Sequence, residues 1–241
     1  MFLIKLKKIK LLLLASFLLF ELACAAKSNN GISIIYMFDV SGSFYKYALP
    51  NSIELADIVF KDISNQSSGL SVFPQIHQVG VINQQSVNIS TQCYVKIDQH
   101  NIFAINKENP DLDKCLKNIS NTKRSQYTDI DGALYYASRA LKGDWFYGKG
   151  IVIFSDLHED VPRVKKFKYD LNGVSVFVVH SPSEEQINDV KLIKVDENKL
   201  IQKLTDHGVN KNSILISTLA SVTTNPDQVK NFFRRSFKNN R

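Results

Sequence analysis

The sequence predicts an α/β fold in which a doubly wound, mostly parallel sheet carries helices on both faces and one antiparallel strand at its edge. Runs of strand length at 32–38, 151–154, 174–179 and 214–216 are apolar almost throughout, as expected for strands buried on both faces of a sheet. Segments with helical spacing of apolar residues lie between these runs. Such alternation of strands and helices is typical of a doubly wound sheet.

The first predicted helix follows Pro50, with Asn51 or Ser52 able to cap its start. Its apolar residues recur at helical spacing: Ile53, Ala56, Val59, Phe60 and Ile63. The pattern then changes between about 70 and 98. Apolar segments at 79–82, 87–89 and 94–97 are separated by polar residues, which predicts an antiparallel hairpin at the edge of the sheet.

The remaining predicted elements are helical. A short helix is expected around 112–119, and a longer one at 128–141 has one apolar face, with Thr128 or Asp129 at the capping position. A further helix lies somewhere in 184–206. A short basic helix at about 226–237 is expected to dock its phenylalanines and leave its arginines and lysines in solvent.

Composition limits the class of protein. The 241 residues are 44% hydrophobic and 22% charged, which excludes a disordered chain, a collagen-like chain and a disulfide-dense miniprotein. No linker or repeat divides the chain. We therefore expect a single domain over 26–241, with a core at about 31–220 and a basic C-terminal helix or tail.

The first 25 residues have the pattern of a secretory signal peptide. Four lysines precede an apolar run at 11–20, and small residues follow it. The run is about half of the roughly 20 residues that a membrane-spanning helix needs, so we expect cleavage rather than a membrane span. Loss of 1–25 removes four lysines and one glutamate, and the formal charge of +7 becomes +4. The mature protein is then expected outside the cytoplasm, secreted or periplasmic, and its modest charge does not indicate nucleic-acid binding.

Two interpretations of Cys24 stay open. Ala23 and Ala25 suit a signal peptidase that cuts after Ala25 and discards Cys24. Alternatively, Cys24 is the lipidated first residue of a bacterial lipoprotein, although Glu21 stands where that motif normally has an aliphatic residue. In either case Cys93 and Cys115 remain. An oxidising compartment favours a disulfide between them, and two buried thiols are the alternative.

Side chains that bear oxygen follow two of the predicted strands. Asp39, Ser41 and Ser43 come directly after the strand 32–38, and Asp156 comes just after 151–154. Thr128 lies where the chain enters the helix 128–141. Because parallel strands place their carboxyl ends at one edge, where open α/β sheets bind ligands, these side chains are expected to converge there. Oxygen ligands of this kind suit Mg²⁺, and also Mn²⁺ or Ca²⁺, better than zinc.

At these residues the chain resembles the von Willebrand factor A domain family. The metal-ion-dependent adhesion site of that family uses Asp-x-Ser-x-Ser, a distant Thr and a later Asp, which match Asp39, Ser41, Ser43, Thr128 and Asp156. The resemblance covers roughly 31–220 and rests on three short motifs in the correct order. Leu157 departs from the pattern, because the family commonly has Gly after the final Asp.

The resemblance implies a binding function. Ser41 and Ser43 would coordinate the cation directly, Thr128 directly or through water, and Asp39 and Asp156 largely through water. One coordination position would stay open for an Asp or Glu carboxylate of a partner protein. The implied role is adhesion or the assembly of a surface, secretion or conjugation complex, without catalysis.

Two other hypotheses stay open. One is a metal-dependent hydrolase at the same site. An aspartyl-phosphate enzyme, however, wants a second carboxylate two residues after its nucleophile, where this chain has Ser41. The other is a von Willebrand A-like scaffold that binds no metal. His158, Glu159 and Asp160 follow Asp156 and are interpreted as solvated loop residues. The alternatives are that they border the metal site or hold a second ion.

Overall fold

The computed structural model describes residues 31–64, 70, 74–83, 93–97, 110–143, 146–161 and 167–238. The predicted signal segment, with Cys24, and the apolar segment 87–89 lie outside the described residues. In the part of the chain that is described, none of the helices combines the length and the apolar character that crossing a membrane requires.

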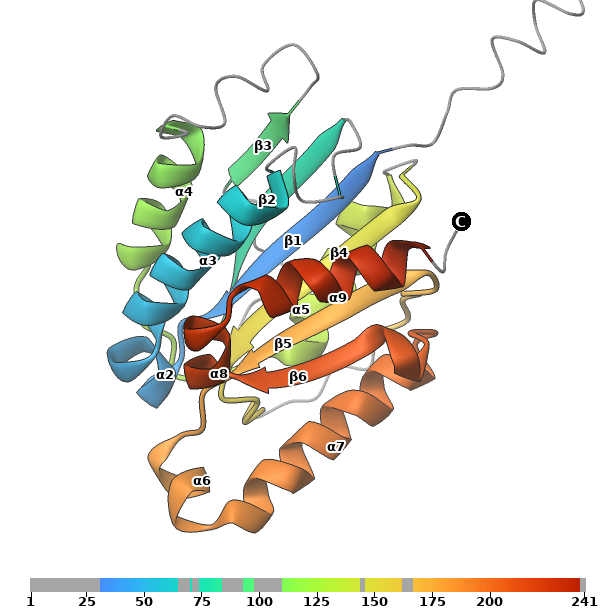
Figure 1. Ribbon diagram of the computed structural model, residues 1–241. Coiled ribbons are helices and arrows are strands. Elements are labelled where there is room, and N and C mark those ends of the chain that lie inside the picture. Colours follow the sequence, from blue (N-terminus) through green and yellow to red (C-terminus); the bar gives the residue numbers. More distant parts are fainter. Residues whose placement is uncertain are drawn as a thin grey trace, which may run out of the picture.

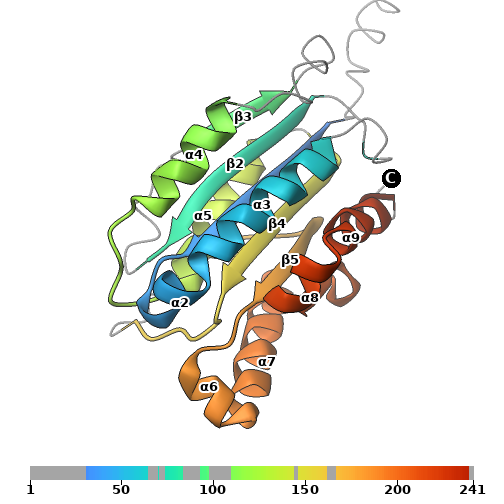
Figure 2. The same cartoon turned by 60° about the vertical axis from the view of Figure 1, so that its left-hand side comes forward.

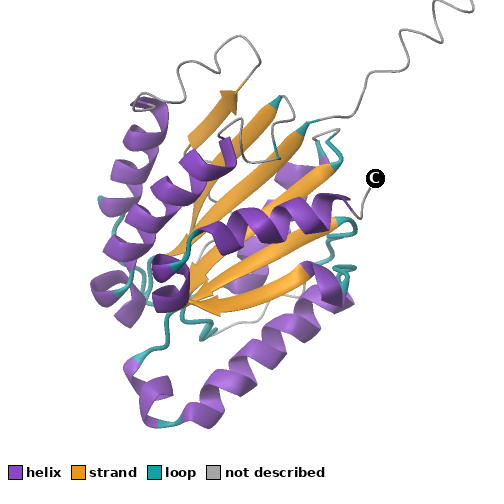
Figure 3. Cartoon of the chain, in the orientation of Figure 1, coloured by secondary structure: helices purple, strands orange, loops and turns teal. Residues whose placement is uncertain are grey.

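A six-stranded sheet forms the centre of the protein (Figures 1 and 3). Its strands lie in the order β3-β2-β1-β4-β5-β6. All neighbouring pairs are parallel except β2 and β3, so the antiparallel strand lies at one edge. This arrangement confirms the predicted fold class. The strands are β1 (Ile32–Asp39), β2 (Gln75–Ile82), β3 (Cys93–Ile97), β4 (Gly148–Ser155), β5 (Val174–His180) and β6 (Ile214–Thr218).

Helices cover both faces of the sheet, as Figure 2 shows from a second direction. One face packs against α2 (Gly42–Tyr47), α3 (Leu49–Ser64), α4 (Pro110–Ser120), α8 (Leu219–Thr224) and α9 (Asp227–Lys238). The other face packs against α5 (Ile130–Lys142) and α7 (Val190–Asp206), and the short helix α6 (Glu184–Asn188) precedes α7.

The two helical layers explain why β1 is apolar at nearly every position. Ile34, Tyr36 and Phe38 belong to the core on one face, whereas Ile35 and Met37 belong to the core on the other. Successive side chains of a strand point to opposite faces, so both sets must be apolar when both faces are covered.

The C-terminal helix α9 packs as predicted. Phe232, Phe233 and Phe237 are buried against the sheet, next to β4 and β5. Gly150 of β4 leaves room for the Phe233 ring, since a Cβ atom at this position would lie 2.6 Å from it.

The structure also contains the predicted disulfide between Cys93 and Cys115. Cys93 begins the edge strand β3 and Cys115 lies in α4, so the bond ties this helix to the edge of the sheet. Tyr94 and Lys96 alternate with the buried residues of β3 and are exposed. A charged residue on an exposed edge discourages pairing with another chain.

The start of α3 differs from the prediction. The helix begins at Leu49, ahead of Pro50, so Asn51 and Ser52 lie inside it and do not cap it. Proline is tolerated there because the backbone N–H groups of the first turn have no partner within the helix. The short helices α2 and α8 were not predicted, since six residues are too few to show a helical period.

Strand β2 begins at Gln75, earlier than its apolar residues predicted. Gln75 and His77 of this strand are buried, and a hydrogen-bonded chain with Tyr36 of β1 satisfies the His77 ring. The Tyr36 hydroxyl donates to Nδ1 of His77 (3.2 Å), and Nε2 of His77 donates to Oε1 of Gln75 (3.1 Å). Burial lowers the pKa of His77 to about 3, so the ring is neutral.

Candidate metal centre

Asp39 is the last residue of β1 and is fully buried. Its Oδ1 accepts a hydrogen bond from the Ser41 amide (2.8 Å), and its Oδ2 accepts one from the Ser155 hydroxyl (2.7 Å). Strands β1 and β4 are paired in register at Phe38 and Phe154, which brings the residues that follow them side by side. Both oxygens of the carboxylate are therefore held by the ends of two neighbouring strands.

The loop ahead of α5 runs beside the end of β1. The Ser125 amide donates to the Val40 carbonyl (2.8 Å), and the Gly42 amide donates to the Ser125 carbonyl (3.3 Å). This pairing delivers Thr128, whose hydroxyl donates to Oγ of Ser41 at 2.5 Å although 87 positions separate the two residues. The predicted meeting of Thr128 with the Asp-x-Ser-x-Ser segment is thus present.

Asp156 follows β4 and is 5% exposed. Its Oδ1 accepts from the His158 amide (3.1 Å). Burial, and next the negative charge of Asp156, raise the pKa of Asp39 to about 7, against the lowering effect of hydrogen bonds from Ser41 and Ser155. The negative charges of the two carboxylates therefore repel each other, and the burial of Asp39 strengthens this repulsion.

A pocket of about 430 Å³ opens at this edge of the sheet. Ser41, Thr128 and Asp156 line it, and Asp39 lies buried behind Ser41. Ser43 lies in the first turn of α2, and its side chain is not among those that the structure describes. Asp160, from the same loop as Asp156, and Glu184 and Glu185, from the start of α6, complete the wall together with Gly42, Gln126, His158 and Ser183.

These donors fit a hard divalent cation. Hydroxyl and carboxylate oxygens are the ligands that Mg²⁺ and Mn²⁺ prefer. A cation here would also offset the repulsion between Asp39 and Asp156. Among the described residues, no group of three or more His, Cys, Asp and Glu side chains is arranged to hold a metal ion, so a cation at this edge would also need the hydroxyl oxygens of Ser41 and Thr128.

Glu159 and Asp160 lie in a loop, and Asp160 is exposed and Glu159 partly exposed, but each also accepts a hydrogen bond that the sequence did not reveal. Asp160 Oδ1 accepts from the Thr128 amide (2.8 Å), and Glu159 Oε1 accepts from the Asp131 amide (2.9 Å). Both acceptors serve N–H groups at or just before the first turn of α5, which have no partner within the helix. Asp129 caps the same helix through the Gly132 amide, as one of the two predicted caps. A carboxylate beside a helix start is a signal that could have identified these roles.

Leu157, the residue that departs from the family pattern, has a left-handed backbone with φ of +64°. In the part of the chain that the structure describes, it is the only non-glycine residue with a positive φ. This conformation costs a leucine about 1–2 kcal/mol. The side chain is 3% exposed and packs in the core beneath α5 and α7, which offsets that cost. The loop thus keeps the backbone shape that glycine adopts easily.

The chain matches no protein-family model and no curated protein sequence. Among solved structures, the pilus adhesin SpaC from Lactobacillus rhamnosus GG aligns with 88% of this chain, with 8% identity and a TM-score of 0.52. A von Willebrand factor type A protein from Catenulispora acidiphila aligns with 86% of the chain, with 8% identity and a TM-score of 0.44.

The aligned regions cover 31% of the SpaC chain and 43% of the Catenulispora chain, so this protein spans less than half the length of either. At such low identity, likeness shows the fold alone, and it says nothing about ligands or partners. The chain has a six-stranded, mostly parallel α/β fold, and the solved structures similar to it include von Willebrand factor A proteins and pilus adhesins.

Proposed function

We propose that this is an exported protein that binds a divalent cation and, through the cation, a carboxylate of a partner protein. Mg²⁺ is the expected cation, and Mn²⁺ and Ca²⁺ are the alternatives. The cation site consists of Asp39, Ser41, Ser43, Thr128 and Asp156. The observation that carries the proposal is the convergence of Asp39, Ser41, Thr128 and Asp156, from three separate segments, at one edge of the sheet beside an open pocket.

The residues around the site have distinct tasks. In this proposal the hydroxyls of Ser41 and Ser43 would supply direct ligands, and Thr128 would supply a third, directly or through water. Asp39 and Asp156 would act largely through water bound to the cation. Ser155 and the Ser41 amide hold both oxygens of Asp39, so this carboxylate stays fixed behind Ser41.

A cation held here mainly by neutral hydroxyls would keep much of its positive charge and would be able to accept an Asp or Glu carboxylate of a partner. The acidic walls of the pocket make binding of a partner carboxylate dependent on the cation. Asp160, Glu184 and Glu185 would repel a carboxylate when no cation is present, so binding of the partner depends on the metal.

The proposed activity is binding and not catalysis. Position 41 is a serine, so Asp39 has no second carboxylate two residues on that could protonate a leaving group. Loss of phosphate-ester hydrolysis in Asp39→Asn, after measurable hydrolysis by the unaltered protein, would favour the hydrolase instead. The proposed role of this metal-dependent contact is adhesion, or the assembly of a surface, secretion or conjugation complex.

Export rests on the N-terminal sequence, with removal of 1–25 and a secreted or periplasmic mature protein. The mass of the mature N-terminus tests it. A chain that starts at Ala26 supports cleavage after Ala25, whereas a chain that starts at a lipid-modified Cys24 shows the lipoprotein alternative. An intact N-terminus contradicts export by this route.

Titration calorimetry with Mn²⁺ and Mg²⁺ tests the cation site. The unaltered protein should bind one ion, and Asp39→Ala should lose binding at least tenfold. Asp206→Ala is the matched control, because Asp206 is an exposed carboxylate of α7 that accepts only from Gln202 in the described contacts. Equal binding by all three proteins would contradict the proposed site.

Capture of partners from source membranes or culture fluid tests the second half of the proposal. A partner that is retained in Mg²⁺, released by EDTA and absent with Asp39→Ala supports a contact through the metal. A partner retained equally in EDTA contradicts it.

A further inference from the structure

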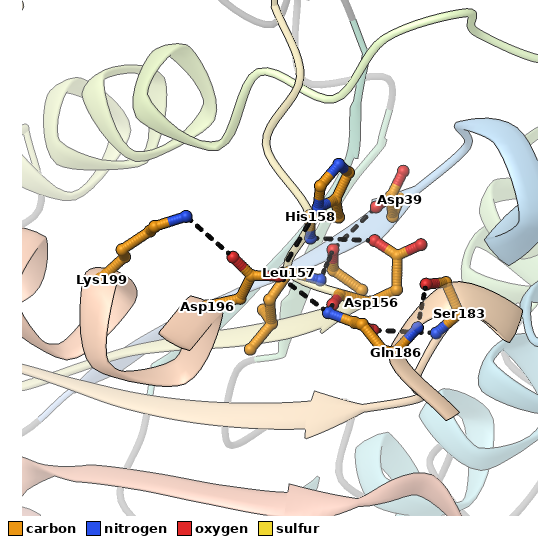
Figure 4. Close-up of polar contacts among 9 residues, drawn as sticks. Asp39, Asp156, Leu157, His158, Ser183, Gln186, Asp196 and Lys199 are labelled. Carbon is orange, nitrogen blue, oxygen red and sulfur yellow. Dashed lines mark hydrogen bonds and ion pairs between the residues drawn. The ribbon is translucent and has the colours of Figure 1, made fainter. Parts of the chain in front are cut away.

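Gln186 connects the candidate metal centre to the helices α6 and α7. The residue lies in α6 and is 1% exposed. Its side-chain amide nitrogen donates to the backbone carbonyl of Asp156 (2.8 Å) and to Oδ2 of Asp196 in α7 (3.0 Å). Its Oε1 accepts from the Ser183 amide (2.9 Å). Figure 4 shows this side chain between Asp156, Asp196 and Ser183.

Every polar atom of the Gln186 side chain is therefore in use, and a buried amide with such partners has one favoured orientation. The Ser183 contact belongs to a capping box, in which the Ser183 hydroxyl also accepts from the Gln186 amide. This box fixes the start of α6. Gln186 thus contacts the loop of the candidate metal centre from a helix whose first turn is held by this capping box.

The bond to Asp156 acts on the peptide that joins Asp156 to Leu157. The carbonyl of this peptide accepts from Gln186, and its N–H donates to Oγ of Ser155 (2.9 Å). Both ends are held while Leu157 has its unfavourable positive φ. Without the Gln186 donor, the peptide can rotate toward a backbone that leucine prefers.

Rotation of this peptide would disturb the site. The Asp156 side chain is held by the amide of His158, which follows Leu157. The Ser155 hydroxyl, which accepts from the Leu157 amide, donates to Asp39. Both candidate carboxylates thus depend on the orientation of one peptide.

Asp196 carries the connection into α7. It is buried, its Oδ1 accepts from Lys199 (3.1 Å), and its Oδ2 lies 3.5 Å from Nδ1 of His158. The contact with Gln186 joins α6 to the middle of α7. A change in how α6 and α7 pack would therefore reach Asp156 through Gln186.

We propose that Gln186 is a positioning residue that sets the Asp156–Leu157 peptide, and that it couples cation binding to the packing of α6 and α7 on the sheet. The coupling part rests on the proposed function, because it requires a cation at Asp39 and Asp156. Coupling is reciprocal, so a cation at the site stabilises the position of α6 and α7 by the same free energy.

Gln186→Met tests the proposal, because methionine has a similar shape but no amide. Two controls accompany it. Gln202→Met makes the same change on the exposed side of α7, and Val229→Ala destabilises the fold through a fully buried residue of α9, away from the site. We expect Mn²⁺ affinity to fall about tenfold in Gln186→Met and to change less than twofold in both controls. Equal affinity in Gln186→Met and Val229→Ala would overturn the coupling.

Hydrogen exchange in EDTA tests the positioning role without a metal. The amides of Leu157 and His158 should exchange at least tenfold faster in Gln186→Met than in Val229→Ala, after correction for global stability. Equal rates would overturn the positioning role. If the unaltered protein binds no Mn²⁺, the proposed function and the coupling fail together, while exchange still decides whether Gln186 holds the peptide.

Hydrogen exchange of the unaltered protein, with and without Mg²⁺, tests the coupling without any substitution. Saturating Mg²⁺ should slow amide exchange in α6 and the first half of α7 and leave α9 unchanged. Protection of α2 and α5 alone, with no effect on α6 and α7, would overturn the coupling.

Discussion

Replacement of Asp39 by asparagine should make the metal-free protein more stable at high pH. Burial and the charge of Asp156 raise the pKa of Asp39 to about 7 from an ordinary value of 3.8. The folded protein then binds more protons than the unfolded chain between these pH values. The contribution of Asp39 to stability is therefore fully present below about pH 4 and is lost as the pH rises through about 7.

The magnitude follows from the two pKa values. Between pH 5 and pH 8, ionisation of Asp39 in the folded state costs about 3 kcal/mol relative to the unfolded chain. An asparagine side chain does not ionise. It also offers one acceptor where Asp39 uses two, for Ser41 and Ser155, and this mismatch costs about 1 kcal/mol at every pH.

Urea unfolding in EDTA at pH 5 and pH 8 measures the effect. The free energy of unfolding of Asp39→Asn minus that of the unaltered protein should rise by about 3 kcal/mol from pH 5 to pH 8. Asp206→Asn, which changes an exposed carboxylate on α7, is the control and should differ from the unaltered protein by less than about 0.5 kcal/mol at both pH values. If the difference in free energy of unfolding between Asp39→Asn and the unaltered protein is constant or falls with rising pH, burial and the charge of Asp156 do not destabilise ionised Asp39.

Three other predictions concern the fold. Burial lowers the pKa of His77 to about 3, so its contribution to stability is present above pH 6.5 and falls by about 2 kcal/mol from pH 8 to pH 5; His77→Gln should abolish that fall in urea unfolding, and an unchanged pH profile would contradict it. Gly150→Ala should lower the free energy of unfolding by about 1–3 kcal/mol, because the new methyl meets the Phe233 ring, whereas Gly80→Ala in β2 meets no atom within 4 Å and should cost far less; similar losses would argue against this packing of α9. Reduction of the Cys93–Cys115 bond, which spans 22 positions, should add two hydrogens to the intact mass and remove about 3 kcal/mol of stability, and a mass that does not change on reduction would exclude the bond.

Much of the sheet could be predicted because strands that are buried on both faces are apolar at nearly every position. Ile35 and Tyr36 are adjacent and both apolar since each faces a different helical layer. Strand β2 was harder to find. Gln75 and His77 are buried there because Tyr36, from a neighbouring strand, and Gln75 satisfy the His77 ring, and a pattern of apolar residues along one segment cannot reveal such pairing.

The same distinction applies to the candidate site. Asp39, Ser41, Thr128 and Asp156 could be brought together from sequence because parallel strands end at one edge and because short motifs mark them. Gln186 and Asp160 carry no motif. Gln186 forms a hydrogen bond with the Asp156 carbonyl, and Asp160 forms one with the Thr128 amide. Because every residue has the same backbone groups, the sequence does not show which of them a distant side chain contacts.

The most direct test of the cation site is a crystal grown with Mn²⁺, with diffraction recorded at the manganese absorption edge. We predict one anomalous peak in the pocket, within bonding distance of the hydroxyl oxygens of Ser41 and Ser43, bound to Thr128 directly or through water, and bridged to Asp39 and Asp156 by water. No peak there at saturating Mn²⁺, or a peak only at other residues, would contradict it.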